Sequence, residues 1–171
     1  MEHFIDREQE TETLQTEYDR NGSSLVILYG RRRVGKTTLI SEFIKDKKAL
    51  YFLASEESES QNRSAFHEKA AEFLDNDLLR NAAVNNWDIL FKAIMDKGFG
   101  TKPCIVLDEF QYLGKANSAF PSVFQRIWED VLKDRSVMVI LCGSLISMME
   151  SQTLAYGSPL YGRRTAQIRL R

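Results

Sequence analysis

Chemistry in this chain is indicated most directly by two glycines, a lysine and a threonine close to residue 30. The apolar segment 25–29 leads into Gly30, and after four intervening residues the chain continues as Gly35-Lys36-Thr37. Glycine at these positions lets the backbone turn sharply and pass close to a bound group, because no Cβ intervenes. A lysine and a hydroxyl at this spacing, between an apolar strand and an amphipathic helix, are typical of a loop that wraps phosphate groups. The segment therefore predicts a phosphate-binding loop.

Each part of the predicted loop has a definite role in holding a nucleoside triphosphate. Backbone N–H groups and the positive end of the following helix face the phosphates. Lys36 supplies a mobile positive charge, and the Thr37 hydroxyl is placed to bind Mg²⁺. The alternative, a chance glycine-containing turn, is disfavoured by the strand and helix on either side. We expect the nucleotide to contact Gly30, Arg31, Arg32, Arg33, Val34, Gly35, Lys36, Thr37 and Thr38.

A second candidate site is the acidic pair Asp108-Glu109, which follows the apolar segment 104–107. Downstream of a phosphate loop, Asp108 would hold Mg²⁺ directly or through water, and Glu109 would orient and deprotonate an attacking water. The alternative for Glu109 is a surface acid beyond the end of a strand. The pair favours hydrolysis over phosphoryl transfer to a metabolite, with a small-molecule kinase as the least favoured hypothesis.

Composition places this chemistry in an ordinary globular domain. The chain has 171 residues and a formal net charge of -1, so no global attraction to nucleic acid or membranes is implied. No apolar segment is long enough to span a bilayer and no signal peptide is evident, so we expect a cytoplasmic protein with no membrane contact. Cys104 and Cys142 lie in apolar segments and are expected to be buried free thiols.

The elements that must position these residues alternate along the chain. Continuous apolar segments predict strands at 25–29, 49–53, 104–107 and 137–141, and alternation predicts a fifth strand at 165–170. Helical periodicity predicts helices between them, with a loop around 114–118. Strands that alternate with helices indicate a parallel α/β sheet. Ligand groups then gather where the strands end, at their carboxyl edge.

The segments FIDREQE, LYGRRRVGKTTLI, IVLDEFQYL, LCGS and SPLYGRR, in this order, resemble the archaeal-type ATPase family. This family is a prokaryotic branch of the AAA+/STAND P-loop ATPases, related to the origin-recognition initiators. The resemblance implies a three-layer P-loop sandwich with helices on both faces of a five-stranded parallel sheet of order 5-1-4-3-2. It also implies that ATP and Mg²⁺ are bound and that Glu109 is the catalytic carboxylate.

Further roles follow from the resemblance alone. Ser144 matches the position that senses the γ-phosphate or the attacking water; its alternative is a simple helix cap. Arg163, with its neighbour Arg164, stands where relatives keep an arginine that reaches into an adjacent subunit, which implies a homo-oligomer. The alternative is a solvated pair of loop arginines. The N-terminal residues Phe4, Ile5 and Arg7 resemble the segment beside the adenine, or else form a hydrophobic staple onto the domain.

Two features depart from the simplest pattern. The three arginines 31–33 occupy variable loop positions, where they either raise the local nucleotide concentration or form a basic rim for DNA or an acidic partner. The family continues beyond the fifth strand into a helical lid or winged helix, so we expect residues 1–171 to be the single N-terminal ATPase domain of a longer protein. The leading hypothesis is Mg-dependent ATP hydrolysis. The alternative is a nucleotide-gated switch that binds DNA or a protein.

Overall fold

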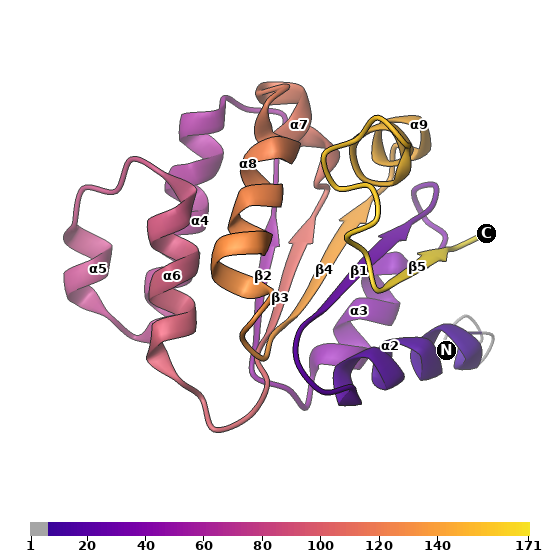
Figure 1. The fold of residues 1–171 in the computed structure, drawn as a ribbon, viewed down its shortest axis with the longest axis horizontal. Helices are drawn as coiled ribbons and strands as arrows, with labels where there is room; N and C mark the ends of the chain where they lie inside the picture. Colours follow the sequence, from indigo (N-terminus) through magenta and orange to yellow (C-terminus); the bar gives the residue numbers. More distant parts are fainter. Residues whose placement is uncertain (1–6) are drawn as a thin grey trace.

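The computed structural model describes residues 7–171, which form a five-stranded sheet flanked by helices (Figure 1). The strand order is β2-β3-β4-β1-β5, and every neighbouring pair is parallel. The predicted order and the predicted fold class are therefore confirmed. The strands are β1 (Ser24–Tyr29), β2 (Ala49–Leu53), β3 (Cys104–Asp108), β4 (Met138–Gly143) and β5 (Ala166–Arg169).

The register of the sheet brings four strand ends to one edge. Tyr29 at the end of β1 lies opposite Gly143 at the end of β4, and Leu53 at the end of β2 lies opposite Asp108 at the end of β3. The Gly30 N–H also donates to the Gly143 carbonyl at 3.2 Å. The residues that immediately follow β1, β3 and β4 are thus neighbours, as expected of a parallel α/β sheet.

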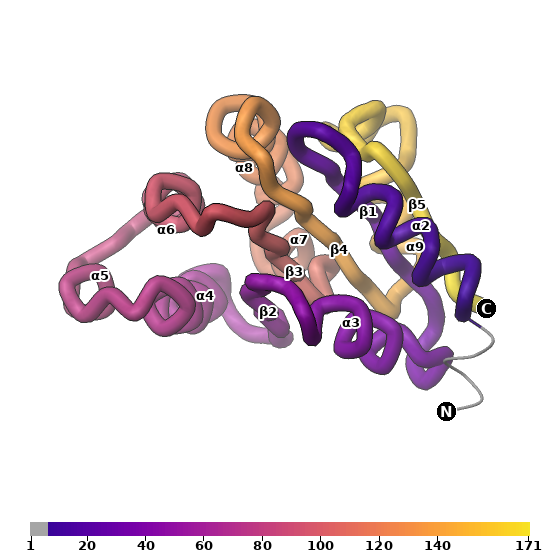
Figure 2. Tube along the Cα trace, turned by 90° about the horizontal axis from the view of Figure 1, so that it is seen from below, coloured from indigo at the N-terminus to yellow at the C-terminus, as the bar shows by residue number. Residues whose placement is uncertain are grey.

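Helices cover both faces of the sheet because strand side chains alternate between them (Figure 2). Val26 and Leu28 of β1 pack with helices α2 (Glu8–Asp19) and α3 (Lys36–Ile44). Leu25 and Ile27 face the larger apolar cluster. That cluster is covered by α4 (Glu59–Leu74), α6 (Trp87–Lys97), α8 (Phe120–Ile127) and α9 (Ile146–Met149), with π-helical turns at Trp128–Leu132 and Glu150–Leu154.

Two short helices differ from the sequence-based expectation. Helix α5 (Asp77–Asn81) was not predicted, and α7 (Gln111–Ala116) covers part of the loop expected around 114–118. The loop prediction is wrong for residues 114–116, which are helical, whereas residues 117 and 118 lie between α7 and α8 as predicted. In the structure Gly114 is buried, and a Cβ there would lie 2.4 Å from the Gln152 side chain. Glycine at 114 therefore permits close packing within a helix rather than a turn.

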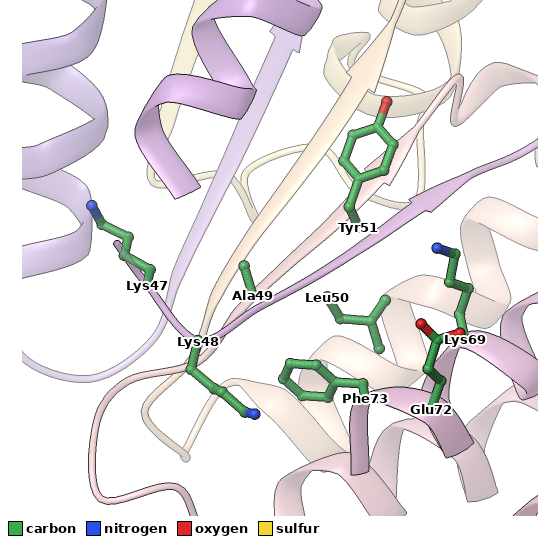
Figure 3. A pocket seen from close by; sticks show the side chains of 8 residues that line it. All are labelled: Lys47, Lys48, Ala49, Leu50, Tyr51, Lys69, Glu72 and Phe73. Atoms are coloured by element: carbon green, nitrogen blue, oxygen red, sulfur yellow. The ribbon is translucent and has the colours of Figure 1, made fainter. Parts of the chain in front are cut away.

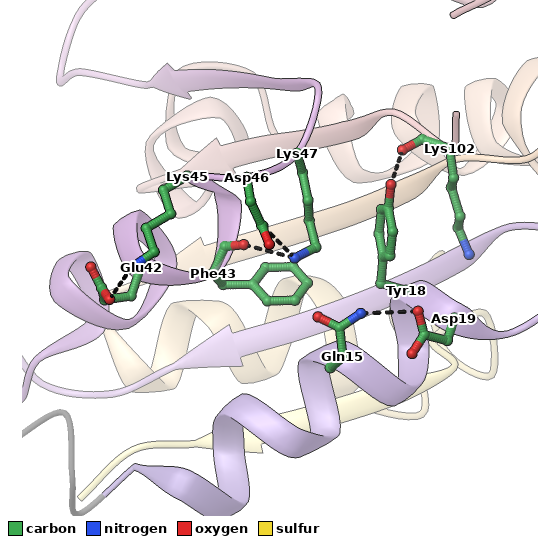
Figure 4. A network of polar contacts seen from close by, with 9 residues as sticks. All are labelled: Gln15, Tyr18, Asp19, Glu42, Phe43, Lys45, Asp46, Lys47 and Lys102. Carbon is green, nitrogen blue, oxygen red and sulfur yellow. Dashed lines mark hydrogen bonds and ion pairs between the residues drawn. The ribbon is translucent and has the colours of Figure 1, made fainter. Parts of the chain in front are cut away.

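Helix α2 is fixed at its C-terminal end, which in turn sets where its first residues lie. The Tyr18 hydroxyl donates to the Lys102 carbonyl at 2.7 Å, and the Lys47 ammonium, beside the Tyr18 ring, donates to Phe43 O at 2.9 Å (Figure 4). The pKa of Tyr18 is raised, first by burial, so its hydroxyl remains a donor. The other end of α2 lies beside β5 and the phosphate loop (Figure 1).

Both cysteines are free and buried, as predicted. Burial raises the pKa of Cys104 to about 12 and that of Cys142 well above its ordinary value, so neither thiol is a ready nucleophile. Among residues 7–171, no helix combines the length and the apolar character needed to cross a bilayer.

Gly30 offers a test of how closely β5 packs against the start of the loop. A Cβ on Gly30 would lie 2.6 Å from the Leu170 carbonyl oxygen, which belongs to backbone and cannot move freely. We expect Gly30→Ala to lower the free energy of unfolding by about 1–3 kcal/mol. Thermal unfolding without nucleotide measures this, at roughly 2–4 °C for each kcal/mol. Gly157→Ala is the control, because nothing lies within 4 Å of a Cβ there; equal melting temperatures for the two variants would contradict the prediction.

Candidate nucleotide-binding site

The loop between β1 and α3 has a backbone that few side chains tolerate. Arg33 has φ 68° and Gly35 has φ 97°, both in the left-handed region. No atom of the described residues lies within 4 Å of a Cβ built on Gly35, so its dihedral angle, rather than crowding, favours glycine there. Gly35 is also the N-cap of α3, and no side chain of residues 7–171 caps that helix. The N-terminal N–H groups of α3 are therefore free to bind an anion.

Lys36 is buried and curls back over the loop that precedes it. Its ammonium donates to the carbonyl oxygens of Gly30 at 2.8 Å and Arg31 at 2.9 Å. Burial lowers the pKa of Lys36, and the carboxylates of Glu109 and Asp108 partly offset this effect. A positive charge is thus held at the loop, opposite the acidic pair.

Asp108 ends β3, is buried, and has a partner on each carboxylate oxygen. Its Oδ1 accepts the Glu109 N–H at 2.8 Å, and its Oδ2 accepts the Tyr51 hydroxyl. Burial, followed by the hydrogen bond and the charge of Asp108, raises the pKa of Tyr51 far above its ordinary value. Tyr51 therefore keeps its proton and acts as the donor.

Glu109 has an unusual backbone conformation. Its φ is 53°, a left-handed conformation that costs about 1–2 kcal/mol for a residue other than glycine. Its Oε2 accepts the Ser144 hydroxyl at 2.9 Å, and the next residue, Phe110, donates its N–H to the Cys142 carbonyl at 2.8 Å. Glu109 is thereby held half-buried against the end of β4 rather than extended into solvent.

These residues surround one hollow of ≈ 450 Å³, which we call the loop pocket. Basic side chains and the acidic pair both line it. Arg32 is exposed, and its guanidinium donates to the Tyr112 hydroxyl at 2.8 Å. The pocket is lined by Arg32, Arg33, Lys36, Thr37, Tyr51, Leu53, Ala54, Asp108, Glu109, Tyr112 and Ser144.

The oxygen ligands in the loop pocket suit a hard cation. Thr37 is exposed on the pocket and carries a hydroxyl, and Asp108 contributes a carboxylate. Mg²⁺ is commonly bound by one or two such protein oxygens together with substrate phosphates and water. Within residues 7–171 no cluster of three or more His, Cys, Asp or Glu side chains forms a metal cage. The donor set therefore fits Mg²⁺ that is shared with a phosphate ligand.

Other predicted site residues lie outside the loop pocket. The Nε of Arg163 is 2.6 Å from Glu129 Oε1 in the turn that follows α8, so this arginine pairs within its own chain. Arg7 donates to the Val34 carbonyl at 2.6 Å and to the Arg171 carbonyl at 3.2 Å. It thus links α2 to the loop and to the end of β5. Phe4 and Ile5 lie outside the described residues.

Sequence reasoning missed two tyrosines of the loop pocket. The sequence predicts Tyr51 as one apolar residue of a buried strand, and Tyr112 enters only within the family segment IVLDEFQYL. The available signal for Tyr51 was its place on a strand expected beside the one that ends in Asp108. Residues 51 and 53 share a face of β2, and Leu53 pairs with Asp108.

The fold is that of a P-loop ATPase. A Walker-type ATPase of Pyrococcus abyssi superposes with a TM-score of 0.71 at 21% identity, covering 96% of this chain and 53% of that one. The ORC2 protein of Aeropyrum pernix, solved as ADPNP–ADP complexes, gives 0.66 at 17% identity, covering 96% and 47%. At these identities the similarity establishes the fold alone.

A family model described as an ATPase domain predominantly from Archaea matches residues 4–171. The chain belongs to this family, which confirms the resemblance stated above and makes the chain an ATP-binding ATPase domain. An uncharacterized protein of Methanocaldococcus jannaschii is 34% identical over 168 residues. An uncharacterized ATP-binding protein of the same organism is 51% identical over 45 residues, covering 26% of this chain and 76% of the relative. The match to the first relative covers 98% of this chain but only 36% of the relative's length.

Proposed function

We propose that this domain hydrolyses ATP to ADP and phosphate in a Mg²⁺-dependent reaction of the AAA+/STAND type. One observation carries the proposal: Lys36, Thr37, Asp108 and Glu109, which come from two distant segments of the chain, line the same pocket. Phosphoryl transfer to water requires a lysine for the phosphate, a hydroxyl for the metal, and two carboxylates in different surroundings.

Different residues of the chain bind the phosphates, hold the metal and activate the water in this proposal. The loop amides and the start of α3 bind the β- and γ-phosphates, and Lys36 exchanges its carbonyl partners for phosphate oxygens. Mg²⁺, held by Thr37 and Asp108, would neutralise phosphate charge that develops during transfer. Glu109 orients a water and accepts its proton as the water oxygen bonds to the γ-phosphorus. The bond from that phosphorus to the bridging oxygen breaks, and ADP leaves with that oxygen.

Ser144 supports this scheme as the group that orients Glu109, since its hydroxyl already bonds to that carboxylate. Arg163 takes part in the scheme only if it reaches the nucleotide of a neighbouring copy. To do so it must break its ion pair with Glu129. A DNA or protein partner belongs to the alternative, a nucleotide-gated switch. One structural neighbour, the ORC1 protein of Aeropyrum pernix, was solved in complex with DNA.

The test measures nucleotide binding and phosphate release together. With ATP and Mg²⁺ the purified domain is expected to release one phosphate for each ADP formed, and chelation of Mg²⁺ by EDTA is expected to stop the release. Binding of ATP without phosphate release would favour the nucleotide-gated switch. The observation that favours this alternative is that Glu109 and Arg163 are both held by partners within the chain. ADP formed without phosphate would favour a kinase, and failure to bind ATP would overturn the proposal.

A further inference from the structure

Tyr51 lies between two hollows on the surface of the domain. The first is the loop pocket. The second is a groove of ≈ 460 Å³ along β2, lined by Lys47, Lys48, Ala49, Leu50, Tyr51, Lys69, Glu72 and Phe73 (Figure 3). In Figure 3 the Tyr51 ring extends away from Lys48 and Phe73, with its hydroxyl at the far end. Among residues 7–171, Tyr51 alone lines both hollows.

The sheet places the Tyr51 hydroxyl beside Asp108 through strand register. Leu53 of β2 is the direct partner of Asp108, and Tyr51 is the partner of Val106. The tyrosine therefore reaches Asp108 from two residues earlier on the adjacent strand, along the face that residues 51 and 53 share. The length of the tyrosine side chain allows its hydroxyl to reach Asp108 across this two-residue offset.

The two donors on Asp108 act on different oxygens. Tyr51 donates to Oδ2 and the Glu109 N–H donates to Oδ1. The terminal torsion of an aspartate is broad, so an unsupported carboxylate can rotate. An ionised carboxylate offers about four lone-pair sites. Two donors on opposite oxygens fix its plane and leave acceptor sites for one more ligand.

We propose that Tyr51 is a positioning residue for the metal site: its hydroxyl holds the Asp108 carboxylate in the orientation that binds Mg²⁺ or a Mg²⁺-bound water. The proposal rests on the proposed function only in taking Asp108 as a metal ligand. Tyr51 touches neither the phosphate nor the water in this scheme. Groups that orient a metal-binding carboxylate typically contribute about 10–100-fold to metal affinity.

Tyr51→Phe removes the hydroxyl and keeps the ring. Metal affinity is expected to fall about 10-fold, at the lower end of that range, because the phosphates and Thr37 still hold the cation. The Mg²⁺ concentration for half-maximal hydrolysis should rise by the same factor. The rate at saturating Mg²⁺ should stay within about twofold of the parent rate, since Glu109 and Lys36 are untouched.

Tyr18→Phe is the matched control. The Tyr18 hydroxyl also donates a hydrogen bond, to the Lys102 carbonyl. It lies at the C-terminal end of α2, outside the loop pocket. If the loss of metal affinity merely reflected the removal of one hydroxyl, Tyr51→Phe and Tyr18→Phe would lose affinity equally. Thermal unfolding without metal checks that both variants are folded at the assay temperature.

The deciding measurement is direct binding of Mn²⁺ to the protein with ADP, followed by the EPR signal of free Mn²⁺. We expect parent and Tyr18→Phe to bind equally, and Tyr51→Phe to bind about 10-fold more weakly. Equal binding by Tyr51→Phe and the parent would overturn the inference. Asp108→Asn provides the reference: if it also leaves Mn²⁺ binding unchanged, the metal-ligand assignment fails together with the inference. Weakened Mn²⁺ binding in Tyr51→Phe, without phosphate release by the parent, would overturn only the proposed hydrolysis.

Discussion

Replacing Glu109 with glutamine is expected to lower phosphate release by about 10²–10⁴-fold, the usual contribution of a positioned general base. The amide cannot accept the proton of an attacking water. It keeps the size of the side chain and an oxygen that can still accept the Ser144 hydroxyl. ATP should therefore bind about as well as to the parent domain, because Lys36, Thr37 and the loop are unchanged.

Single-turnover phosphate release, measured beside equilibrium binding of ATP, separates these two effects. Glu12→Gln is a suitable control, since Glu12 is exposed on α2, away from the loop pocket. An unchanged rate in Glu109→Gln would remove the general-base role from this residue. Loss of binding and rate together would instead indicate that Glu109 helps to form the pocket.

Lys36→Ala should have the second large effect, on nucleotide affinity rather than on the chemical step alone. The buried ammonium provides charge-assisted hydrogen bonds worth about 1.5–3 kcal/mol. At about 1.4 kcal/mol for each factor of ten, the Kd for ATP should rise roughly 10–100-fold. The pKa of Lys36 is lowered mainly by burial, so keeping this side chain charged in the folded state lowers the stability of the fold. A bound phosphate offsets this loss of stability.

Titration with a fluorescent ATP analogue measures the change in affinity directly. The shift of the unfolding midpoint with added ATP gives a second estimate, because a ligand that binds only the folded state stabilises it by mass action. Lys45→Ala serves as the control: Lys45 is an exposed lysine just after α3, paired with Glu42 at 2.7 Å. Equal Kd values for the parent and Lys36→Ala would contradict the role given to Lys36.

Much of the architecture was predictable because it depends on local patterns. Continuous apolar segments predicted four strands, alternation over 165–170 predicted the fifth, and the glycine spacing predicted the loop between 30 and 38. Strand order came from the family resemblance, since an apolar segment does not specify its neighbour. Given that order, parallel strands bring the ends of β1, β3 and β4 together, which predicts that Lys36, Asp108 and Ser144 share an edge.

Contacts that depend on exact register could not be predicted in this way. The Tyr51–Asp108 hydrogen bond requires knowing that Leu53 pairs with Asp108, and a shift by one residue would move Tyr51 to the other face. The partner of Arg163, Glu129, lies on a different element and is chosen by packing. Gly114 was misinterpreted for the same reason, because its neighbour Gln152 is brought in by the tertiary fold.

The left-handed backbone of Glu109 has a consequence for how this position can evolve. Glycine would adopt φ 53° without strain, and asparagine with less strain than glutamate. On the proposed function, folding and hydrolysis therefore place opposite demands on residue 109. A mutant library selected only for heat resistance should accumulate glycine or asparagine at 109, whereas selection for ATP turnover should retain glutamate. Residue 109 is thus where we expect a trade-off between stability and activity in this domain to become visible.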